Sequence, residues 1–424
     1  MEVPIHLTPS ATAAVLRGHP WVYREGVAAP PARGGRGARP PRALPRLDSG
    51  TVVDLVAEGA PFAGRGLWDA SSPIAIRVFQ RTPERPLDER AVLDRLEAAF
   101  RLRDAWFGEE GATDAYRLCH GEGDRVPGFV IDRYGPIAVL RFDGGALRTW
   151  QDRLLPGLAR ALQRRGVASI GVRAGEGDAD AAIAAGGRKV IHLHGPPIPD
   201  RLVVRERGMA MEVDLARGQK TGAFLDQREN RARVRALAAG RARVLNLFSY
   251  AGGFSIAAAL GGAGRVTSVD TAAGAHATAQ RSFRENGLDP AAHDFVTADA
   301  FDFLERARAR GERFDLVVSD PPSFAPNERA RARALGAYRR LHGAIARVLG
   351  EGGVLCAASC SSHVTAEDFL TTLDDAALER DDLRLTALHG QPADHPTLPA
   401  WPEGRYLKLA VLEGASSADA HPTA

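Results

Sequence analysis

The stretch Val244-Leu-Asn-Leu-Phe-Ser-Tyr-Ala-Gly-Gly253 decides the fold of this chain. Its apolar first half has the character of a β-strand, its small residues form a turn, and the alanine-rich segment 254–260 that follows has helical character. A second strand pattern at 266–270 then ends in the carboxylate of Asp270. A strand, a glycine turn, a helix and a strand with a terminal acid form half of a nucleotide-binding α/β unit.

The same alternation of strand and helix continues toward the C-terminus. Helices are expected at 272–286, 300–310, 331–349 and 365–378, and strands at 295–299, 314–319, 353–359 and 406–412. Alternating units of this length predict an α/β fold with a doubly wound, mainly parallel sheet. In such a sheet, ligands bind at the carboxyl ends of the strands.

Composition describes an ordinary globular protein of two or three domains: 424 residues, 45% hydrophobic, 25% charged, with a formal net charge of +3. The three cysteines are too few for a disulfide scaffold and lack the CxxC spacing of a zinc site, so no metal is expected. The N-terminus shows no signal peptide, and glycines and polar residues interrupt the uncharged run 244–264. These features predict a cytoplasmic protein without a membrane partner.

The N-terminal half divides into two smaller regions. Residues 1 to about 80 contain the strand patterns 51–56 and 74–79, and Trp21 is expected to pack into this small core. Arginine and proline dominate residues 28–47, which predicts a mobile insertion. An α+β region follows, with helices at 87–107 and 151–165 and strands at 137–142, 169–173 and 189–194. Within it, His120, Glu122 and Asp124 stand among glycines, which favours a structured turn over a metal cluster.

A hairpin is expected at 203–213, and a polar, glycine-bearing loop at 219–230 follows it. The loop leads into an arginine-rich helix at 228–237, for which Asp226 is the expected N-cap. The loop at 219–230 precedes the glycine turn, so we expect it to close over a bound cofactor.

Polar or special residues follow each of the first five strands of the expected C-terminal sheet. They are Gly252 and Gly253, Asp270, Asp299, Asp320 and Cys360. Parallel strands end at one edge of a sheet, so these residues form a single rim. After the fourth strand, Asp320-Pro-Pro-Ser-Phe324 presents a carboxylate on a proline-stiffened loop that can grip a planar, nitrogen-bearing substrate.

The glycine turn, the strand-end acids and the D-P-P loop together resemble the class I S-adenosylmethionine-dependent methyltransferases. Arg17-Gly-His-Pro-Trp-Val-Tyr23, the segment 121–134 and the segment 220–228 extend the resemblance over essentially the whole chain. With these motifs the chain resembles the bacterial 23S ribosomal RNA cytosine-5 methyltransferases that carry an N-terminal PUA domain. The resemblance implies a PUA-like RNA-binding domain at 1–82, a connecting α+β domain at 83–200, a Rossmann-like methyltransferase domain at 201–414 and a disordered tail at 415–424.

The resemblance also implies roles for individual residues. The expected S-adenosylmethionine contacts are Lys220, Phe248, Ser249, Tyr250, Gly252, Gly253, Asp270, Asp299, Ala300 and Asp320. Asp270 would take the ribose hydroxyls and Asp299 the adenine amine. Cys360 matches the family nucleophile, and Asp320 is the second catalytic residue. Cys356, inside the expected strand, is interpreted as a buried core residue.

The implied chemistry explains the need for a cysteine, because carbon 5 of cytosine becomes nucleophilic only after a thiolate has added to carbon 6. The D-P-P-S-F loop also resembles RNA guanine-N7 methyltransferases, which need no thiol, and a non-catalytic RNA-binding assembly factor is the third alternative. The implied partner is 23S rRNA or a large-subunit precursor. The sequence leaves open whether the protein forms a homodimer. Four arginines flank the expected catalytic mouth and are candidate RNA contacts: Arg228, Arg231, Arg329 and Arg331.

Overall fold

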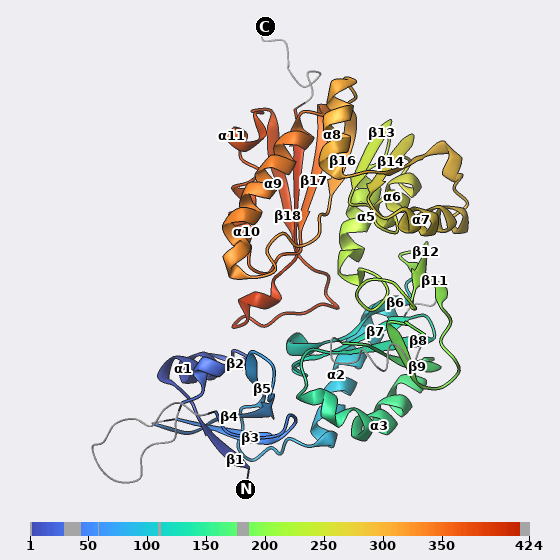
Figure 1. The fold of residues 1–424 in the computed structure, drawn as a ribbon. Helices are drawn as coiled ribbons and strands as arrows, with labels where there is room; N and C mark the ends of the chain where they lie inside the picture. The colour runs from blue at the N-terminus through green and yellow to red at the C-terminus, as the bar shows by residue number, and fades with distance from the viewer. Residues whose placement is uncertain (1, 29–43, 58, 109–111, 176–185, 416–424) are drawn as a thin grey trace. The chain divides into compact units, whose positions relative to one another are not determined.

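The computed structural model describes residues 2–28, 44–57, 59–108, 112–175 and 186–415. The chain divides into two compact units, each assembled from more than one segment (Figure 1). Unit 1 comprises Met1–Leu202, Asp214–Ala223 and Ala393–Gly404, and unit 2 comprises Val203–Val213, Phe224–Pro392 and Arg405–Ala424. Most of the expected insertion, and all of the expected tail after residue 415, lie outside the described residues.

Unit 1 begins with a five-stranded sheet in the order β1-β3-β4-β5-β2. Its elements are β1 (Val3–His6), α1 (Pro9–Arg17), β2 (Trp21–Tyr23), η1 (Arg24–Gly26), β3 (Val52–Ala57), β4 (Ala60–Trp68) and β5 (Ile74–Gln80). Strands β3 and β5 confirm the two predicted strands. The prediction for Trp21 was wrong, because Trp68 fills this core. The Trp21 indole N–H donates to Glu122 Oε1 at 2.7 Å, and its ring contacts that of Trp401 edge to face.

The second part of unit 1 is a five-stranded sheet in the order β10-β9-β8-β7-β6, against which two helices pack. Its elements are α2 (Glu89–Phe107), β6 (Ala115–His120), η2 (Gly121–Asp124), β7 (Phe129–Tyr134), β8 (Ile137–Phe142), η3 (Leu147–Trp150), α3 (Gln151–Gln163), β9 (Ser169–Arg173) and β10 (Val190–His194). Helix α2 confirms the helix predicted at 87–107, and its buried positions Val92, Leu96, Ala99, Phe100 and Arg103 recur at helical spacing. The two sheets of unit 1 have largely separate hydrophobic cores.

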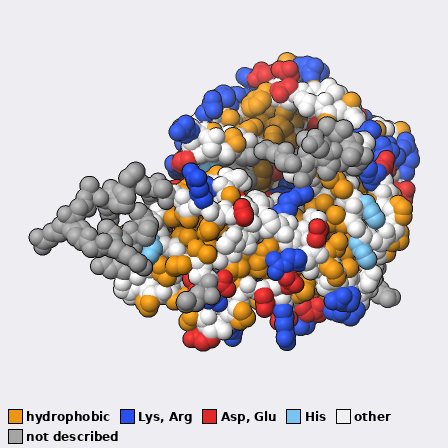
Figure 2. All heavy atoms as spheres, turned by 60° about the horizontal axis from the view of Figure 1, so that its bottom comes forward, with side chains coloured by type: hydrophobic (Ala, Val, Ile, Leu, Met, Phe, Trp, Pro, Cys, Tyr) orange, Lys and Arg blue, Asp and Glu red, His pale blue; other side chains and the backbone are white. Residues whose placement is uncertain are grey.

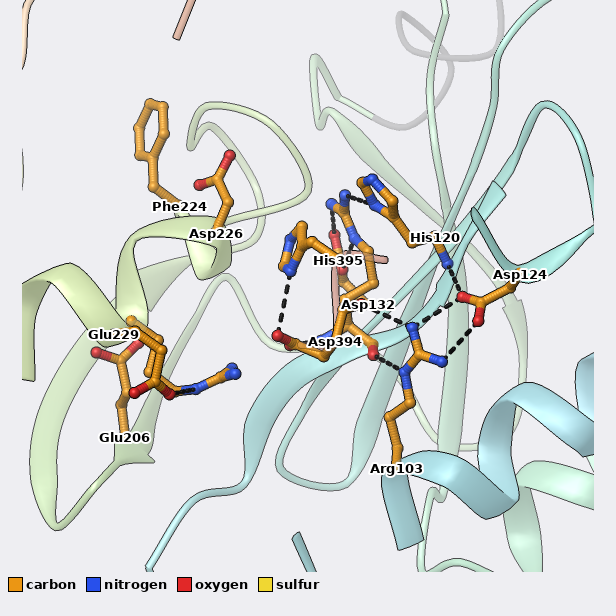
Figure 3. Close-up of polar contacts among 12 residues, drawn as sticks. Arg103, His120, Asp124, Asp132, Glu206, Phe224, Asp226, Glu229, Asp394 and His395 are labelled. Atoms are coloured by element: carbon orange, nitrogen blue, oxygen red, sulfur yellow. Dashed lines mark hydrogen bonds and ion pairs between the residues drawn. The ribbon is translucent and has the colours of Figure 1, made fainter. Parts of the chain in front are cut away.

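Buried ion pairs fix segment 393–404 to the second sheet of unit 1 (Figure 3). Arg103, fully buried, donates to both carboxylate oxygens of Asp124 at 2.7 and 2.8 Å and to the main-chain oxygen of Asp394 at 2.7 Å. Burial disfavours ionisation of Asp132, but the fork from Arg117 and the hydroxyl of Thr221 overcome it, so the pKa of Asp132 lies below its usual value. Each buried charge in this group therefore has a partner.

Unit 2 contains a seven-stranded sheet in the order β15-β14-β13-β16-β17-β19-β18. Its strands are β13 (Arg243–Leu247), β14 (Arg265–Asp270), β15 (Asp294–Thr297), β16 (Phe314–Ser319), β17 (Leu349–Ser359), β18 (Leu383–His389) and β19 (Lys408–Gly414). The first five are parallel and β19 is antiparallel to both of its neighbours. This confirms the predicted doubly wound, mainly parallel sheet.

Helices of unit 2 connect the strands. They are η5 (Leu225–Gln227), α5 (Arg228–Leu237), α6 (Gly253–Leu260), α7 (Ala273–Glu285), η6 (Pro290–Ala292), α8 (Ala300–Ala309), η7 (Glu328–Ala330), α9 (Arg331–Ala346), α10 (Ala366–Leu370) and α11 (Asp375–Leu378). The predicted hairpin is confirmed as β11 (Arg201–Glu206) and β12 (Met209–Asp214). No helix in the described ranges is long and apolar enough to cross a membrane.

Three features of this region differ from the sequence predictions. The helix predicted at 365–378 is two short helices, because the Thr371 and Thr372 hydroxyls donate back to main-chain oxygens and Asp374 caps a new helix. The edge strand β18 was not predicted. Segments 214–223 and 393–404, expected in a continuous domain at 201–414, belong to unit 1.

Gly123 offers a test of how segment 393–404 is held. A Cβ atom at this position would overlap the carbonyl oxygen of Pro396, so Gly123→Ala should cost about 1–3 kcal/mol in free energy of unfolding. Gly274→Ala is the control, because a Cβ there meets no atom within 4 Å. Denaturant unfolding of both variants measures the difference, and equal stabilities would contradict this packing.

Candidate active site

The residues predicted to form a rim do follow five adjacent strands of unit 2. In sheet order, Asp299 follows β15, Asp270 ends β14, Gly252 and Gly253 lie where the turn after β13 leads into α6, Asp320 follows β16 and Cys360 follows β17. Because these strands are parallel, all five positions lie at the same edge of the sheet.

The turn after β13 has an unusual backbone. Phe248 and Tyr250 both have positive φ, at 56° and 45°, and each such non-glycine residue costs roughly 1–3 kcal/mol. The surrounding structure holds the turn in place: the amide of Tyr250 donates to Asp270 Oδ2 at 2.8 Å, and the amide of Ser249 donates to the Val269 oxygen at 3.0 Å. Strained backbone of this kind clusters at ligand sites.

Close packing is by itself a sufficient reason for glycine at positions 252 and 253, without a ligand. Gly252 has φ 79°, and a Cβ there would lie 2.7 Å from the Cβ of Ala279. A Cβ on Gly253 would lie 3.0 Å from Arg231 Cδ. The absence of side chains lets α6 start directly at the turn, against α5 and α7.

Beneath the turn, a buried hydrogen-bond chain joins β13, α6 and β14. Asn246 Nδ2 donates to Ser255 Oγ at 2.8 Å, and Ser255 Oγ lies 2.7 Å from Ser268 Oγ. Ser249 is also buried, and its hydroxyl has no hydrogen-bond partner within the described part of the chain. A buried hydroxyl without a partner suits a site that receives a polar ligand.

Asp270 and Asp299 both hold main-chain amides. Asp270 Oδ1 accepts from the amide of Ala272 at 2.8 Å, in addition to the bond that Oδ2 makes with Tyr250. Asp299 is exposed and caps α8 through the amide of Phe301 at 2.8 Å, with Ala300 buried as the first helical residue. A carboxylate has about four lone-pair sites, so each acid keeps acceptor capacity for a ligand.

Asp320 is held by side chains that sequence reasoning did not assign. Gln227 Nε2 donates to Asp320 Oδ2 at 2.9 Å, and Asn230 Nδ2 donates to Gln227 Oε1 at 2.6 Å. Both amide residues are buried. The hydrogen bonds from Asn230 to Gln227 and from Gln227 to Asp320 therefore fix the direction of the Asp320 carboxylate. The polar residues of the 219–230 loop were the sequence feature that could have indicated these contacts.

The Asp320 loop and the Cys360 segment are joined by hydroxyl contacts. Ser323 Oγ lies 3.0 Å from Ser361 Oγ, and the buried Tyr338 hydroxyl donates to Ser359 Oγ at 2.9 Å. Phe324 packs on the Tyr338 ring at 4.9 Å. Cys360 is half-buried between these anchored neighbours, whereas Cys356 is fully buried within β17, as predicted.

Lys408 is a further residue of this region that the sequence did not reveal. It is 4% exposed, and its ammonium donates to the main-chain oxygens of Ser361, Val364 and Tyr406 at 2.7, 2.7 and 2.9 Å. Burial lowers the pKa of Lys408 to about 8, against the opposing effect of Cys360. A buried cation thus holds the segment that follows Cys360.

Two of the four arginines expected to contact RNA are buried inside unit 2. Arg228 and Arg231 are 2% and 5% exposed, and Arg231 donates to both oxygens of Glu206 at 2.7 and 2.5 Å. A buried, paired guanidinium is not presented to a phosphate, so the expectation was wrong for both. Arg329 is exposed and Arg331 pairs with Asp368 at 2.7 Å while staying partly exposed.

Other expectations from the same region have separate outcomes. Lys220 belongs to unit 1, with φ 49°, and its cofactor contact stays a prediction. Asp226 does not cap α5, whose N-cap is Gln227; instead it accepts from the Tyr406 hydroxyl at 2.7 Å. The described residues contain no metal-binding group of His, Cys, Asp and Glu, and Glu122 and Asp124 pair with Arg77 and Arg103.

Comparisons with known proteins agree with this geometry. A family model described as S-adenosylmethionine-dependent methyltransferase matches residues 186–403, and one described as PUA-like domain matches residues 5–81. The chain is similar to the ribosomal RNA large subunit methyltransferase of Deinococcus radiodurans, with 36% identity over 96% of this chain and 97% of the relative. It is 33% identical to ribosomal RNA large subunit methyltransferase I of Escherichia coli, over 96% and 98%.

Solved structures show the same fold. The crystal structure of SMU.776 complexed with SAH has a TM-score of 0.81 at 24% identity, covering 97% of this chain and 100% of that chain. A structure from Streptococcus mutans gives 0.80 at 23% identity, over 97% and 100%. The fold is therefore a PUA-like N-terminal domain with a C-terminal class I methyltransferase sheet.

Lys408→Met should remove a pH dependence of stability. The pKa of Lys408 is about 8 in the folded protein, whereas its ordinary value is 10.5. Between about pH 8 and pH 10.5, the unfolded chain therefore binds this proton more tightly than the folded protein does. Relative to the variant, the wild-type protein should gain about 2 kcal/mol as pH rises from about 8 to 10.5, because the cost of burying the ammonium disappears. Denaturant unfolding across this range measures the difference. A difference that stays constant with pH would contradict the lowered pKa.

Proposed function

Because the chain belongs to the S-adenosylmethionine-dependent methyltransferases, we propose that it methylates carbon 5 of a cytosine in 23S ribosomal RNA through a covalent adduct with Cys360. The similarity to large-subunit rRNA methyltransferases over almost the whole chain supports RNA, free or in a large-subunit precursor, as the substrate. The observation that carries the proposal is the hydrogen-bonded link between the Asp320 loop and the Cys360 segment, through Ser323 and Ser361.

The turn after β13 would hold the cofactor, through Phe248, Ser249, Tyr250, Gly252 and Gly253. The hydroxyl of Ser249, buried without a partner in the described chain, fits a polar cofactor there. Asp270 would accept the ribose hydroxyls with its remaining lone pairs, and Asp299 with Ala300 would border the adenine. Lys220 is a further proposed contact.

Cys360 would supply the nucleophile for the base. When bound, S-adenosylmethionine supplies an electrophilic methyl group on its sulfonium. The Cys360 thiolate adds to carbon 6 of cytosine, a sulfur–carbon bond forms, and the electron pair of the 5,6 double bond moves to make carbon 5 nucleophilic. Carbon 5 would take the methyl group, whose bond to the sulfonium sulfur breaks to leave a neutral thioether. The carbon 5 proton would then leave to a base, and the bond between carbon 6 and the Cys360 sulfur would break, which expels the thiolate and restores the aromatic ring.

Asp320 would stabilise the charge that develops on the ring when the thiolate adds. Its carboxyl group is oriented by Gln227 and would share a proton with ring nitrogen 3, so the hydrogen bond between them costs little reorganisation. Base chemistry needs an unstacked nucleotide, so the target lies in a loop or an opened helix. Arg329 and Arg331, which follow the D-P-P loop, are proposed RNA contacts.

The proposed mechanism is tested by Cys360→Ala. Methyl transfer to rRNA should fall about a thousandfold or more, because no other group activates carbon 5, while SAH affinity should stay unchanged. Cys356→Ala, which removes a buried thiol four residues earlier on β17, is the matched control. Radiolabel transfer and mass spectrometry of nucleosides give the rate and the methylated atom. An active Cys360→Ala enzyme that makes 7-methylguanosine would replace this proposal with N7 chemistry, and an inactive wild-type protein that still binds RNA would favour an assembly factor.

The cofactor assignment is tested separately by Asp270→Asn. Loss of the charged acceptor should weaken SAH binding at least about tenfold, since hydrogen bonds to charged groups contribute about 1.5–3 kcal/mol. Asp289→Asn is the control, because Asp289 also accepts a main-chain amide, that of Ala291, but precedes β15 at the other edge of the sheet. Calorimetric titration with SAH compares the two, and equal affinities would remove Asp270 from the cofactor site.

A further inference from the structure

Unit 1 contains a pocket of about 520 Å³ whose charged lining comes mainly from arginines. Arg81 follows β5 of the first sheet, Arg95 lies on α2, and Arg125 follows η2 of the second sheet. The pocket thus joins the PUA-like part of unit 1 to its α+β part, within one compact unit.

In the part of the chain that the structure describes, no carboxylate pairs with these three arginines. Asp124 is the one acid in the lining, and its oxygens are occupied by the fork from Arg103 and by the amide of His120 at 2.6 Å (Figure 3). Within the described residues, neither Arg81, Arg95 nor Arg125 has a carboxylate at ion-pair distance. The pocket therefore carries excess positive charge.

The arginines are positioned by main-chain oxygens. Arg95 Nη1 donates to the Arg125 oxygen at 2.8 Å, and Arg81 Nη2 donates to the Gly18 oxygen at 2.9 Å. Arg125 itself has φ 63°, and its amide donates to the Glu122 oxygen at 3.0 Å. A guanidinium has five N–H donors, so each keeps donors for a ligand.

Burial and the neighbouring like charges lower the pKa of two of these arginines. Burial, followed by the charges of Arg125, Arg81 and Arg85, lowers the pKa of Arg95 to about 10. Burial and Arg125 also lower the pKa of Arg81. An anion between the guanidinium groups would relieve both the repulsion and part of the desolvation cost.

The size and lining of the pocket limit which anions it can hold. Its volume lies in the range of small-molecule sites and exceeds that of a phosphate ion. Leu102, half exposed on α2, adds an apolar wall beside the charges. Planar guanidinium forks suit phosphate oxygens, and an apolar wall suits a ribose or a base.

We propose that the pocket formed by Arg81, Arg95 and Arg125 binds a backbone phosphate of the RNA substrate, with the adjoining nucleoside against Leu102. This inference rests on the proposed RNA substrate but not on the methylated atom. On the face drawn in Figure 2, basic side chains are interspersed with acidic ones, so that face is not uniformly basic.

The test compares RNA binding by the full-length double variant Arg95→Gln/Arg125→Gln with binding by Arg101→Gln, which removes an exposed arginine on the same helix. At about 0.15 M salt, the double variant should bind an rRNA fragment about tenfold more weakly, and the slope of log Kd against log salt should fall by about one to two. The control should match wild type in RNA binding, and both variants should keep the wild-type affinity for SAH. If the double variant unfolds, the single variant at exposed Arg125 is used.

Three other outcomes are distinguishable. Unchanged RNA affinity and salt slope in the double variant would overturn the pocket proposal and leave the proposed function intact. Wild-type protein that binds no rRNA fragment at any salt concentration would overturn both. Thermal stabilisation of wild type by AMP or inorganic phosphate, abolished in the double variant while RNA binding is unchanged, would assign the pocket to a free phosphate ligand instead of RNA.

Discussion

The parallel pairing of β13 with β14 on one side and β16 on the other is the interaction on which the candidate site depends. Leu247 is in register with Val269 and with Ser319, so the three strands end together. Side chains alternate along a strand, and a slip by one residue would move Leu245 and Leu247 out of their hydrophobic cluster to the opposite buried face, which Val244 and Asn246 occupy. The same burial that stabilises the sheet therefore fixes the places of Asp270, Asp320 and the strained turn between them.

The strand-end acids show that a structural role and a ligand role are compatible. Asp270 accepts the amides of Tyr250 and Ala272, and Asp299 caps a helix, yet each keeps acceptor sites. The internal hydrogen bonds orient these carboxylates before any ligand arrives. On the other side of β13, a hydrogen bond from Gln227 orients Asp320. Lys408 likewise holds the segment after Cys360 by donating to a main-chain oxygen. Orientation in advance reduces the reorganisation that binding and catalysis require.

The proposed catalytic residues and the proposed phosphate pocket belong to different units of the chain. Segments 214–223 and 393–404 lie far along the sequence but belong with residues 1–202, and buried pairs such as Arg103 with Asp124 and the Asp394 backbone hold the second of them there. The arginine pocket is part of this unit, whereas Cys360 and Asp320 belong to the other. Domain boundaries drawn as continuous stretches of sequence cannot describe such an arrangement.

By itself, the sequence determined the α/β alternation and the polar residue at the end of each strand, because strand and helix periodicities are local. It also determined that these residues share one edge of the sheet, because parallel strands all end at the same edge. Only the tertiary structure decided which charges are buried. Arg228 and Arg231 look like any basic helix face until Glu206 and the packing of α5 enclose them, and Lys408 looks like an ordinary strand residue until the carbonyls of Ser361 and Val364 surround it. The physical reason is that burial and pairing of a charge depend on residues distant in sequence, which no local pattern encodes.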